Sequence, residues 1–462
     1  MKDSSMSSTE VKKPTRRKNS PTSAVVIGAG FSGLSVAYEL GKAGYDVTVL
    51  EAADSVGGLA GSFETDGEKL DRFYHHWFTS DQDVTDLIDE LGLSENVVTN
   101  PTNTGLFFAN KIFRLSTPLD LLRFNALGFT DRIRLGLLAL RARRVDDWMQ
   151  LEKLTAVEWL RKLGGDKVFE VVWEPLLKGK FGPFADKISA VWFWNKLKLR
   201  GSSRGKQGEE RLAYLEGSFA RLAEEIATAI ATKGGTVRLD SPVETVERLE
   251  HGRWSCGGAW GRVESDFVVA TTALPLIADM VENWAEPSYV AQLRRIDYLS
   301  NICLVLQLDR SLSDTYWLNV NDVNFPFVGV IEHTNFQPVS KYAGRHIVYL
   351  SKYLPETDAL YRMKDDEVLD FSVPHLQRMF PDFDPSWIKS HHVWRARWSQ
   401  PVVEKDYSTL IPDEDGPAQG FHLCSMAQIY PEDRGTNYAI REGRKLGQRL
   451  AAAKTPPAED LK

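Results

Sequence analysis

The sequence predicts an α/β fold whose first unit is strand, helix, strand, and three observations lead to it. Apolar residues 24–27 run directly into a glycine-rich turn, Gly28-Ala-Gly-Phe-Ser-Gly33. A stretch compatible with a helix follows, and a second apolar run, 47–50, ends on Glu51. Because these features fall in register within one short βαβ unit, the turn has the context that a dinucleotide site requires. The expected architecture is therefore Rossmann-like.

The residue types of the turn suit a pyrophosphate. Gly28 permits the tight turn, Gly30 lets backbone N–H groups approach the phosphates, and Gly33 lets the helix pack closely on the strand. The phosphates would lie at a helix N-terminus, where unpaired N–H groups and the helix dipole favour anions. Glu51 can accept hydrogen bonds from an adenosine ribose and would repel a 2′-phosphate. We expect the site to include, besides these four residues, Ala29, Ser32 and Ala52.

The rest of the chain predicts further helices and strands around this unit. Helical patterns are expected at 83–91, 118–164, 218–232 and 437–453, and strands at 236–239, 266–270, 299–308, 345–353 and 420–424. A hairpin is expected through Trp254, and the composition of 201–208 indicates a loop. The strands 299–308 and 345–353 are expected to belong to a second sheet.

Composition and charge limit the possible functions. The 462 residues carry a net charge of −7, which gives no general reason to expect binding to nucleic acid. Residues 1–22 are expected to form a disordered basic tail, since the first 20 contain six basic and two acidic side chains. No apolar stretch reaches the roughly 18–20 residues that span a bilayer. Three widely spaced cysteines indicate a reducing compartment, so a cytoplasmic location is expected.

Four segments carry a resemblance to a known family. They are a second glycine pair, Gly57-Gly58, shortly after Glu51, then residues 215–219 with 241–243, residues 265–272, and residues 420–443. On these segments the chain resembles the FAD-dependent superfamily of protoporphyrinogen oxidases, phytoene-type desaturases and flavin amine oxidases. The resemblance implies FAD as the cofactor. It also implies contacts with FAD from Gly57, Gly58, Leu59, the backbone of Val243, and the helix start at Thr436 and Asn437.

The resemblance further implies a discontinuous domain organisation. The Rossmann-like FAD-binding domain would combine residues 23–105, 205–275 and 395–455. A substrate-binding domain of mixed sheet plus helices would combine residues 106–204 and 276–394. The Trp and Phe content of this second domain predicts a largely apolar substrate pocket.

Departures from the family pattern narrow the expected chemistry. Met426 stands where the family usually has an aspartate that holds the ribityl chain, and Asp433 is the candidate replacement. Residues 300–305 lack the lysine of monoamine oxidases, which disfavours simple amine oxidation. Residues 395–419 contain no cysteine, so FAD is expected to be non-covalent. The sequence also lacks a second glycine-rich motif between a strand and a helix, which argues against a separate NAD(P)H domain.

Four residues are candidates for catalysis. His75 and His76 follow the second glycine pair, in a stretch that passes near the isoalloxazine in the family, and could exchange protons near neutral pH. The alternative is that each is a histidine of the core or the surface. Arg395 and Arg397 lie two residues apart on an expected strand, so both side chains share a face. They could clamp a carboxylate or phosphate, or they could form ion pairs on an exposed face.

The segment 111–147 combines basic and apolar residues. It contains eight basic and four acidic side chains among many Leu, Ile and Phe residues. A basic amphipathic face of this kind could make peripheral contact with an anionic membrane or admit a lipid-linked substrate. The alternative is a helix of the substrate domain that packs on its own core.

Three function classes remain open. The leading one is an FAD-dependent oxidoreductase of the oxidase, dehydrogenase or desaturase type, which passes a hydride equivalent from an organic substrate to the flavin. The second is a redox-neutral flavoenzyme resembling UDP-galactopyranose mutases, to which residues 73–79 and 397–401 are similar, acting on a sugar nucleotide. The third is a non-catalytic flavin-binding scaffold. The expected partner is a small-molecule substrate, with an apolar or lipid-linked compound as one option.

Overall fold

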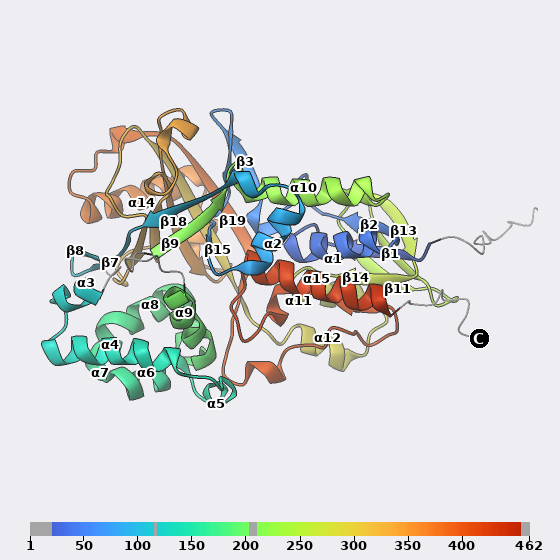
Figure 1. The fold of residues 1–462 in the computed structure, drawn as a ribbon, viewed down its shortest axis with the longest axis horizontal. Coiled ribbons are helices and arrows are strands. Elements are labelled where there is room, and N and C mark those ends of the chain that lie inside the picture. The colour runs from blue at the N-terminus through green and yellow to red at the C-terminus, as the bar shows by residue number, and fades with distance from the viewer. Residues whose placement is uncertain (1–20, 115–117, 203–209, 454–462) are drawn as a thin grey trace, which may run out of the picture.

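The computed structural model describes residues 21–114, 118–202 and 210–453, so nearly all of the expected basic tail lies outside the described residues. Within these ranges a parallel sheet and a larger mixed sheet lie side by side, and a group of helices packs below the mixed sheet (Figure 1). The α/β fold class predicted from the sequence is confirmed.

The parallel sheet is assembled from distant parts of the chain. Its strand order is β10-β2-β1-β14-β20. The strands are β1 (Ser23–Ile27), β2 (Asp46–Leu50), β10 (Thr236–Arg238), β14 (Phe267–Ala270) and β20 (Phe421–Leu423). Each lies within about one residue of a strand expected from the sequence, because each is a short apolar run between turn signals.

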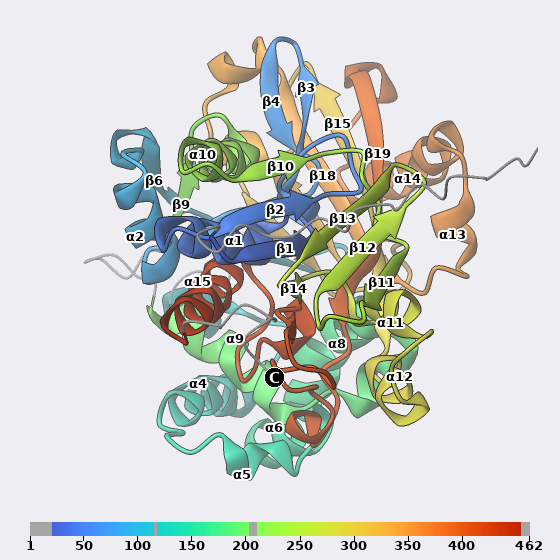
Figure 2. The same cartoon turned by 90° about the vertical axis from the view of Figure 1, so that its right-hand side faces the viewer.

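Different layers cover the two faces of this sheet (Figure 2). Helices α1 (Phe31–Lys42), α10 (Ser218–Thr232) and α15 (Thr436–Ala452) pack on the face that carries Val26, Val49 and Val269. An antiparallel sheet and α11 (Leu274–Val281) pack on the face that carries Val25 and Val268. The antiparallel strands are β11 (Thr245–Arg248), β12 (Trp254–Gly258) and β13 (Gly261–Ser265), which include the expected hairpin through Trp254. Burial on both faces explains why the parallel strands are continuous apolar runs.

The second sheet has seven strands in the order β19-β15-β18-β17-β16-β7-β8. They are β7 (Thr104–Phe108), β8 (Lys111–Arg114), β15 (Tyr298–Leu308), β16 (Trp317–Val320), β17 (Gly329–Glu332), β18 (His346–Leu354) and β19 (Ile388–Pro401). Alternate residues of β15 point to opposite faces. Leu304 and Leu306 meet α14 (Asp365–Met379), whereas Cys303 and Val305 face the core that includes α1 and α10. The mixed sheet therefore turns one face towards the dinucleotide-binding part.

Two small sheets and several short helices complete this part of the fold. The sheets pair β3 (Ser62–Thr65) with β4 (Glu68–Asp71), and β9 (Glu210–Leu215) with both β5 (Trp77–Phe78) and β6 (Val97–Thr102). The helices are α2 (Gln82–Glu90), α12 (Pro287–Leu293) and α13 (Ala359–Arg362).

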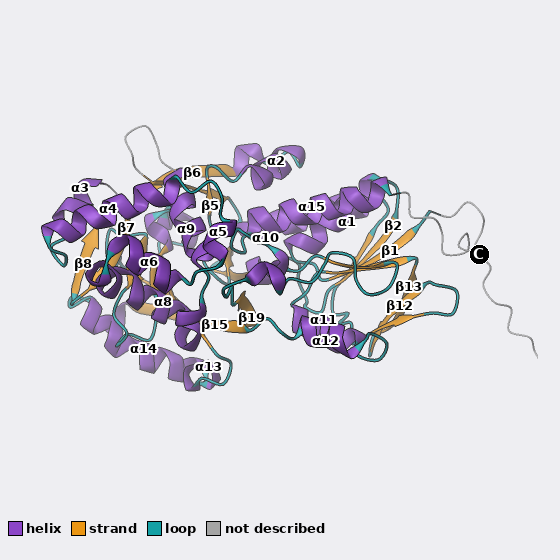
Figure 3. Ribbon diagram, turned by 90° about the horizontal axis from the view of Figure 1, so that it is seen from below, coloured by secondary structure: helices purple, strands orange, loops and turns teal. Residues whose placement is uncertain are grey.

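The expected continuous helical segment 118–164 is instead a series of separate helices (Figure 3). The group comprises α3 (Pro118–Arg123), α4 (Phe129–Arg143), α5 (Met149–Glu152), α6 (Ala156–Gly164), α7 (Asp166–Val168), α8 (Glu174–Phe181) and α9 (Ala190–Ser202). The prediction missed local stop and start signals, such as the capping box in which Thr155 and Glu158 begin α6. Over the described ranges, no helix has both the length and the apolarity needed to cross a bilayer.

Two other expectations need adjustment. The loop expected at 201–208 begins later, because α9 continues to Ser202, and 203–208 lie outside the described residues. The expected domain boundaries at 105/106 and 394/395 fall inside β7 and β19. Apolar alternation identifies a strand but does not reveal the sheet with which it pairs.

Candidate active site

The first glycine motif forms a tight turn between β1 and α1. Gly28 has φ +101°, in the region that favours glycine, and its N–H donates to the Leu50 carbonyl at 2.8 Å. A Cβ on Gly33 would lie 2.0 Å from the Gly28 carbonyl oxygen, so only glycine fits there. The first intrahelical bond runs from Leu34 N–H to the Gly30 carbonyl. The preceding N–H groups, including that of Ser32, therefore point out of the helix start and can receive an anion.

Glu51 lies at the carboxyl end of β2, against this turn. Its carboxylate accepts hydrogen bonds from the N–H groups of Ala29 (2.6 Å) and Ala53 (2.9 Å). The Ser241 N–H donates to the Glu51 carbonyl at 2.8 Å, which places the loop that carries Val243 beside this corner. Predicted ribose and adenine contacts thus come from neighbouring segments of the fold.

The second glycine pair packs directly on the first motif. The Gly57 N–H donates to the Ala29 carbonyl at 2.9 Å, and a Cβ on Gly58 would lie 3.3 Å from Gly30 Cα. Ala52 and Leu59 belong to the same connection after β2. The two motifs, separate in sequence, therefore line one cradle.

Helix α15 runs parallel to α1 and in close contact with it. A Cβ on Gly443 would lie 2.4 Å from the Ser32 carbonyl oxygen, and one on Gly447 would lie 2.9 Å from the Val36 carbonyl oxygen. These contacts imply that the N-terminus of α15 extends a little more than one helical turn, roughly 7 Å along the axis, beyond the N-terminus of α1. Two helix N-termini with no side-chain cap therefore point to the same side, at staggered depths.

This arrangement fits FAD. The α1 N-terminus suits the pyrophosphate, Glu51 the ribose, and the α15 N-terminus at Thr436 and Asn437 a more distant electron-rich edge. Beside the turn, the buried Thr272 hydroxyl finds no hydrogen-bond partner among the described residues, which leaves it available to a ligand. The Asn437 side chain is used otherwise, because it accepts from the Val84 N–H and donates to Asp83, tying α15 to α2.

The two candidate histidines occupy different surroundings. His75 Nδ1 lies 2.7 Å from the Phe73 carbonyl, so Nδ1 carries the proton and Nε2 is the free acceptor. Burial lowers the pKa of His75 to about 4, although the bond to Phe73 opposes this shift. The expectation of titration near neutral pH is therefore wrong for His75. His76 Nδ1 lies 3.0 Å from the Tyr316 hydroxyl, and the His76 ring packs edge-on to the ring of Trp317. Their catalytic roles stay predictions.

The candidate arginines are both engaged by neighbouring segments. Arg395 donates to the Asp365 carboxylate (2.7 Å) and to the carbonyls of Tyr361 (3.0 Å) and Met363 (2.6 Å). Arg397 forms an ion pair with Glu356 and is mostly exposed. These contacts favour the ion-paired alternative, in which the arginines fix the segment before α14 to β19. The role as a substrate clamp stays a prediction.

A charged cluster around the buried Asp433 carboxylate lies just before α15. The Asp433 carboxylate lies 2.7 Å from Lys196 Nζ and 3.9 Å from Lys180 Nζ, and it accepts from Gln400 Nε2 at 3.2 Å. Arg434 donates to Gln400 Oε1 (3.1 Å) and to the Tyr353 hydroxyl (2.8 Å). Three cations thus surround one carboxylate, and the cluster keeps an excess of positive charge.

The pKa shifts of the cluster reflect this crowding. Burial raises the pKa of Asp433, but the facing charges of Lys196, Lys180 and Arg434 outweigh burial and hold that pKa well below its usual range. Burial lowers the pKa of Lys180 to about 7, with Asp433 partly opposing the shift. Lys180 Nζ also lies over the rings of Trp192 (4.7 Å) and Tyr353 (5.1 Å). The ribityl contact predicted for Asp433 stays a prediction, since its carboxylate is already paired.

Sequence reasoning missed Lys180, Lys196 and Arg434. The two lysines belong to the aromatic segment 173–200; α8 packs against β18 and α9 against α4, α5 and α6, and these helices bring Lys180 and the partly exposed Lys196 to Asp433. Arg434 adjoins Asp433, so the pairing of a basic with an acidic residue before the last helix was the available signal. The charge of Arg434 also contributes to the lowered pKa of His75, which links the cluster to the 71–78 stretch.

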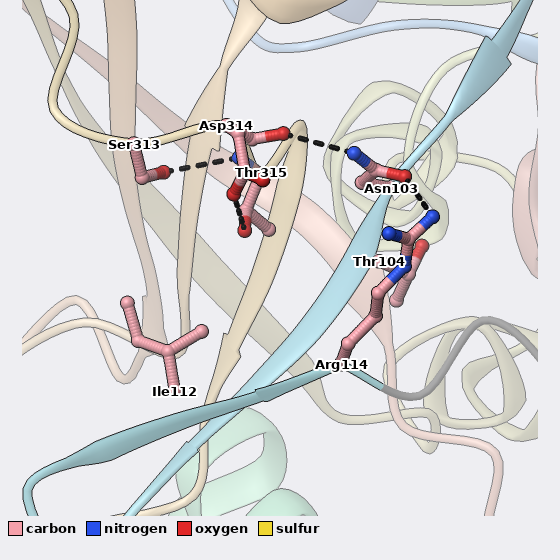
Figure 4. A pocket seen from close by; sticks show the side chains of 7 residues that line it. All are labelled: Asn103, Thr104, Ile112, Arg114, Ser313, Asp314 and Thr315. Carbon is pink, nitrogen blue, oxygen red and sulfur yellow. Dashed lines mark hydrogen bonds between the residues drawn. The ribbon is translucent and has the colours of Figure 1, made fainter. Parts of the chain in front are cut away.

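Two surface cavities lie elsewhere. One, of about 310 Å³, is bordered by strands of the mixed sheet, and Figure 4 shows its hydrogen bonds from Arg114 to Asn103 and from Asn103 to the Asp314 carbonyl. The other, of about 480 Å³, is lined by residues of 98–100 and 334–341. Neither cavity is lined by the glycine motifs or the charged cluster, so we do not assign the chemistry to them.

Glu51→Gln is expected to weaken FAD binding about tenfold, because a charge-assisted hydrogen bond to the ribose contributes roughly 1.5–3 kcal/mol and a neutral one about half as much. Titration of the apoprotein with FAD measures the effect. Asp54→Asn, an exposed acid in the same connection, is the matched control and should bind FAD normally. Normal FAD affinity in a Glu51→Arg protein would contradict the assignment of the ribose contact.

Comparison with known proteins agrees with the geometry. The sequence pattern of the family described as flavin containing amine oxidoreductase matches residues 31–448. The 15-cis-phytoene desaturase of Solanum lycopersicum is 25% identical over 479 residues, covering 94% of this chain and 78% of the desaturase.

Solved structures share the fold. A putative protoporphyrinogen oxidase from Exiguobacterium sp. 255-15 superposes with a TM-score of 0.75 at 18% identity, covering 94% of this chain and all of the other. Reduced UDP-galactopyranose mutase superposes with a TM-score of 0.69 at 14% identity, covering 96% of both chains. These similarities confirm the Rossmann-like architecture and FAD as the cofactor. The chain belongs to the flavin containing amine oxidoreductase family and is an FAD-dependent oxidoreductase.

Proposed function

We propose that the protein removes a hydride equivalent from a carbon of an organic substrate, with non-covalent FAD as the acceptor and oxygen or a quinone as the final oxidant. The observation that carries the proposal is the excess positive charge of Lys180, Lys196 and Arg434 around Asp433, next to the start of α15. FAD supplies the site that accepts two electrons and the negative charge that comes with them. Buried cations placed beforehand stabilise such charge more than solvent-exposed ones do.

Aromatic side chains support an apolar substrate. Tyr74 packs edge-on to Trp317 (4.9 Å between ring centroids) and to Tyr349 (6.2 Å), and His76 also contacts Trp317. These rings lie between the 71–78 stretch and the mixed sheet, adjoining the charged cluster through Tyr353. Aromatic surroundings of this kind favour an apolar or lipid-linked compound over a small polar amine. Peripheral membrane contact and a cytoplasmic location belong to the same proposal, the latter supported by three free, buried cysteines.

Redox-neutral chemistry on a sugar nucleotide is the second candidate, because the same cationic cluster would also suit a diphosphate. The two candidates differ in their need for electrons. The oxidoreductase is reduced by its substrate, whereas the mutase-like enzyme needs flavin that has been reduced beforehand and consumes no electrons.

Anaerobic mixing of the oxidised holoenzyme with 15-cis-phytoene, protoporphyrinogen or UDP-galactopyranose distinguishes the candidates. We expect the flavin absorption to bleach with an apolar substrate. In Lys180→Met bleaching should be at least about tenfold slower, since roughly 1.4 kcal/mol of stabilisation corresponds to a factor of ten. Lys178→Met, in the same helix but 52% exposed, should react at the wild-type rate.

Two outcomes would contradict the proposal. Turnover of UDP-galactopyranose only after dithionite reduction would favour the redox-neutral candidate. Binding of FAD without any spectral response to substrates of all these classes would favour the non-catalytic scaffold.

A further inference from the structure

Exposed apolar side chains gather on one corner of the molecule. Ten large hydrophobic residues are exposed in the described ranges, and seven of them lie between residues 112 and 149. Six of them come from β8, α3 and α4, which lie at one end of the helical group, and Met149 comes from the start of α5, away from β8 and α3 (Figures 1 and 3). The seven are Ile112, Leu122, Phe129, Ile133, Leu137, Leu140 and Met149. Scattered exposed hydrophobics are ordinary, but a group of this kind indicates an interaction surface.

Helix α4 forms the centre of this corner. Phe129, Ile133, Leu137 and Leu140 are spaced i, i+4, i+8 and i+11, so they form one stripe along the helix. Phe129 is 68% exposed. The residues that bury α4 in the protein, Leu135, Leu138 and Ala142, lie on the opposite side of the helix. Helix α4 is therefore apolar on two faces, and its own core accounts for only one of them.

Basic side chains border the exposed stripe. Arg134 and Arg141 lie along one edge of it, and Arg143 lies along the other. The segment 111–147 has eight basic and four acidic side chains, a net charge of +4, whereas the whole chain has −7. Arginines beside an apolar stripe can extend their heads to phosphate groups while their stems lie along the hydrocarbon.

We propose that this docking face, the outward side of α4 with Leu122 of α3, rests on an anionic lipid bilayer. The apolar stripe would enter the boundary between headgroups and acyl chains, and the arginines would pair with lipid phosphates. The opposite signs of the docking face and of the whole chain mean that an anionic surface attracts this face and repels most others. The proposal does not depend on which substrate the enzyme oxidises.

Co-sedimentation of the full-length holoenzyme with vesicles tests the docking face. We expect binding to vesicles of phosphatidylcholine and phosphatidylglycerol in equal parts, and weak binding to phosphatidylcholine alone. The double variant Phe129→Ser, Leu137→Ser should bind at least about tenfold more weakly, since burial of one such side chain contributes roughly 1.5–3 kcal/mol. Arg134→Gln with Arg141→Gln should weaken binding to the anionic vesicles and reduce its salt dependence.

Controls separate loss of the face from loss of the fold. Phe371→Ser changes an aromatic residue that is 40% exposed on α14, and it should bind vesicles as the wild type does. All variants should retain FAD, because the changed side chains are on the surface. Undiminished vesicle binding by the double variant would place the contact elsewhere, for example on the basic N-terminal segment, and would overturn the proposal. The proposal would also be overturned if the wild-type protein were a dimer and the same substitutions dissociated it, since the docking face would then bind a second copy of the chain.

Discussion

Asp433→Asn is expected to lower the free energy of unfolding by about 3–5 kcal/mol at neutral pH, the typical cost of removing one partner from a buried ion pair. The substitution leaves Lys180, Lys196 and Arg434 close together with no carboxylate between them. The amide keeps the shape of the side chain and can still accept a hydrogen bond, so the loss reports the charge. Denaturant unfolding of the holoenzyme measures it.

The loss should depend on pH. Burial lowers the pKa of Lys180 to about 7. A lysine whose pKa is lower in the folded than in the unfolded protein destabilises the folded state more and more as the pH falls from the unfolded pKa to the folded pKa. The carboxylate of Asp433 offsets part of this cost, because it stabilises the charged form of Lys180. The difference between wild type and Asp433→Asn should therefore be larger near pH 6, where Lys180 is charged, than near pH 9, where it is largely neutral.

A surface acid provides the control for this prediction. Asp279 is 64% exposed and forms an ion pair with Arg294. Exposed ion pairs contribute about 0–1 kcal/mol, so Asp279→Asn should change the free energy of unfolding by less than about 1 kcal/mol, with little dependence on pH. An Asp433→Asn protein as stable as Asp279→Asn would show that the cations of the cluster do not need their carboxylate.

Gly443→Val is expected to abolish FAD retention and to destabilise the protein by about 3 kcal/mol, the upper range for overpacking a core. Any Cβ at this position would lie 2.4 Å from the Ser32 carbonyl oxygen and 2.8 Å from Ser35 Cβ. The added side chain must therefore push α15 away from α1 and change the spacing of the two helix N-termini. Flavin content after gel filtration and thermal unfolding are the measurements.

Two further variants test the cause of this effect. Lys445→Val makes the same β-branched residue in the same helix at a position that is 70% exposed, and it should retain FAD. Gly443→Ala introduces only the Cβ and should have an intermediate effect. Normal FAD content in Gly443→Val would mean that the close contact of α1 with α15 does not position the cofactor.

The parts of the site that depend on short-range conformation were predictable from the sequence. The βαβ unit, Glu51 at the end of β2 and the second glycine pair each depend on a few neighbouring residues, and the structure brings them together as expected. The start of α15 was also predictable, because strand β20 precedes it in the sequence and a clear helical pattern follows it.

The charged cluster was not predictable in the same way. Lys180 and Lys196 approach Asp433 from helices far earlier in the chain, and nothing near them in sequence indicates a carboxylate partner. For Arg395 and Arg397 the local structure was predictable, because their alternation correctly indicated that they share one face of a strand. Their partners come from residues 356–365, which include α13 and the first residue of α14, and the sequence pattern did not reveal those partners. Long-range pairing of charges decides both outcomes, and periodicity carries no information about it.

The stagger between α1 and α15 has a consequence for cofactor selection. One N-terminus is suited to the pyrophosphate and the other, roughly 7 Å further along the axis, to the flavin ring. A flavin mononucleotide has a single phosphate and no adenylate half, so it cannot reach Glu51 while its ring lies at α15. The close contacts of Gly443 and Gly447 thus set the spacing for the part of the cofactor between phosphate and flavin ring, whereas Glu51, on the adenosine side, would favour the dinucleotide over its shorter precursor.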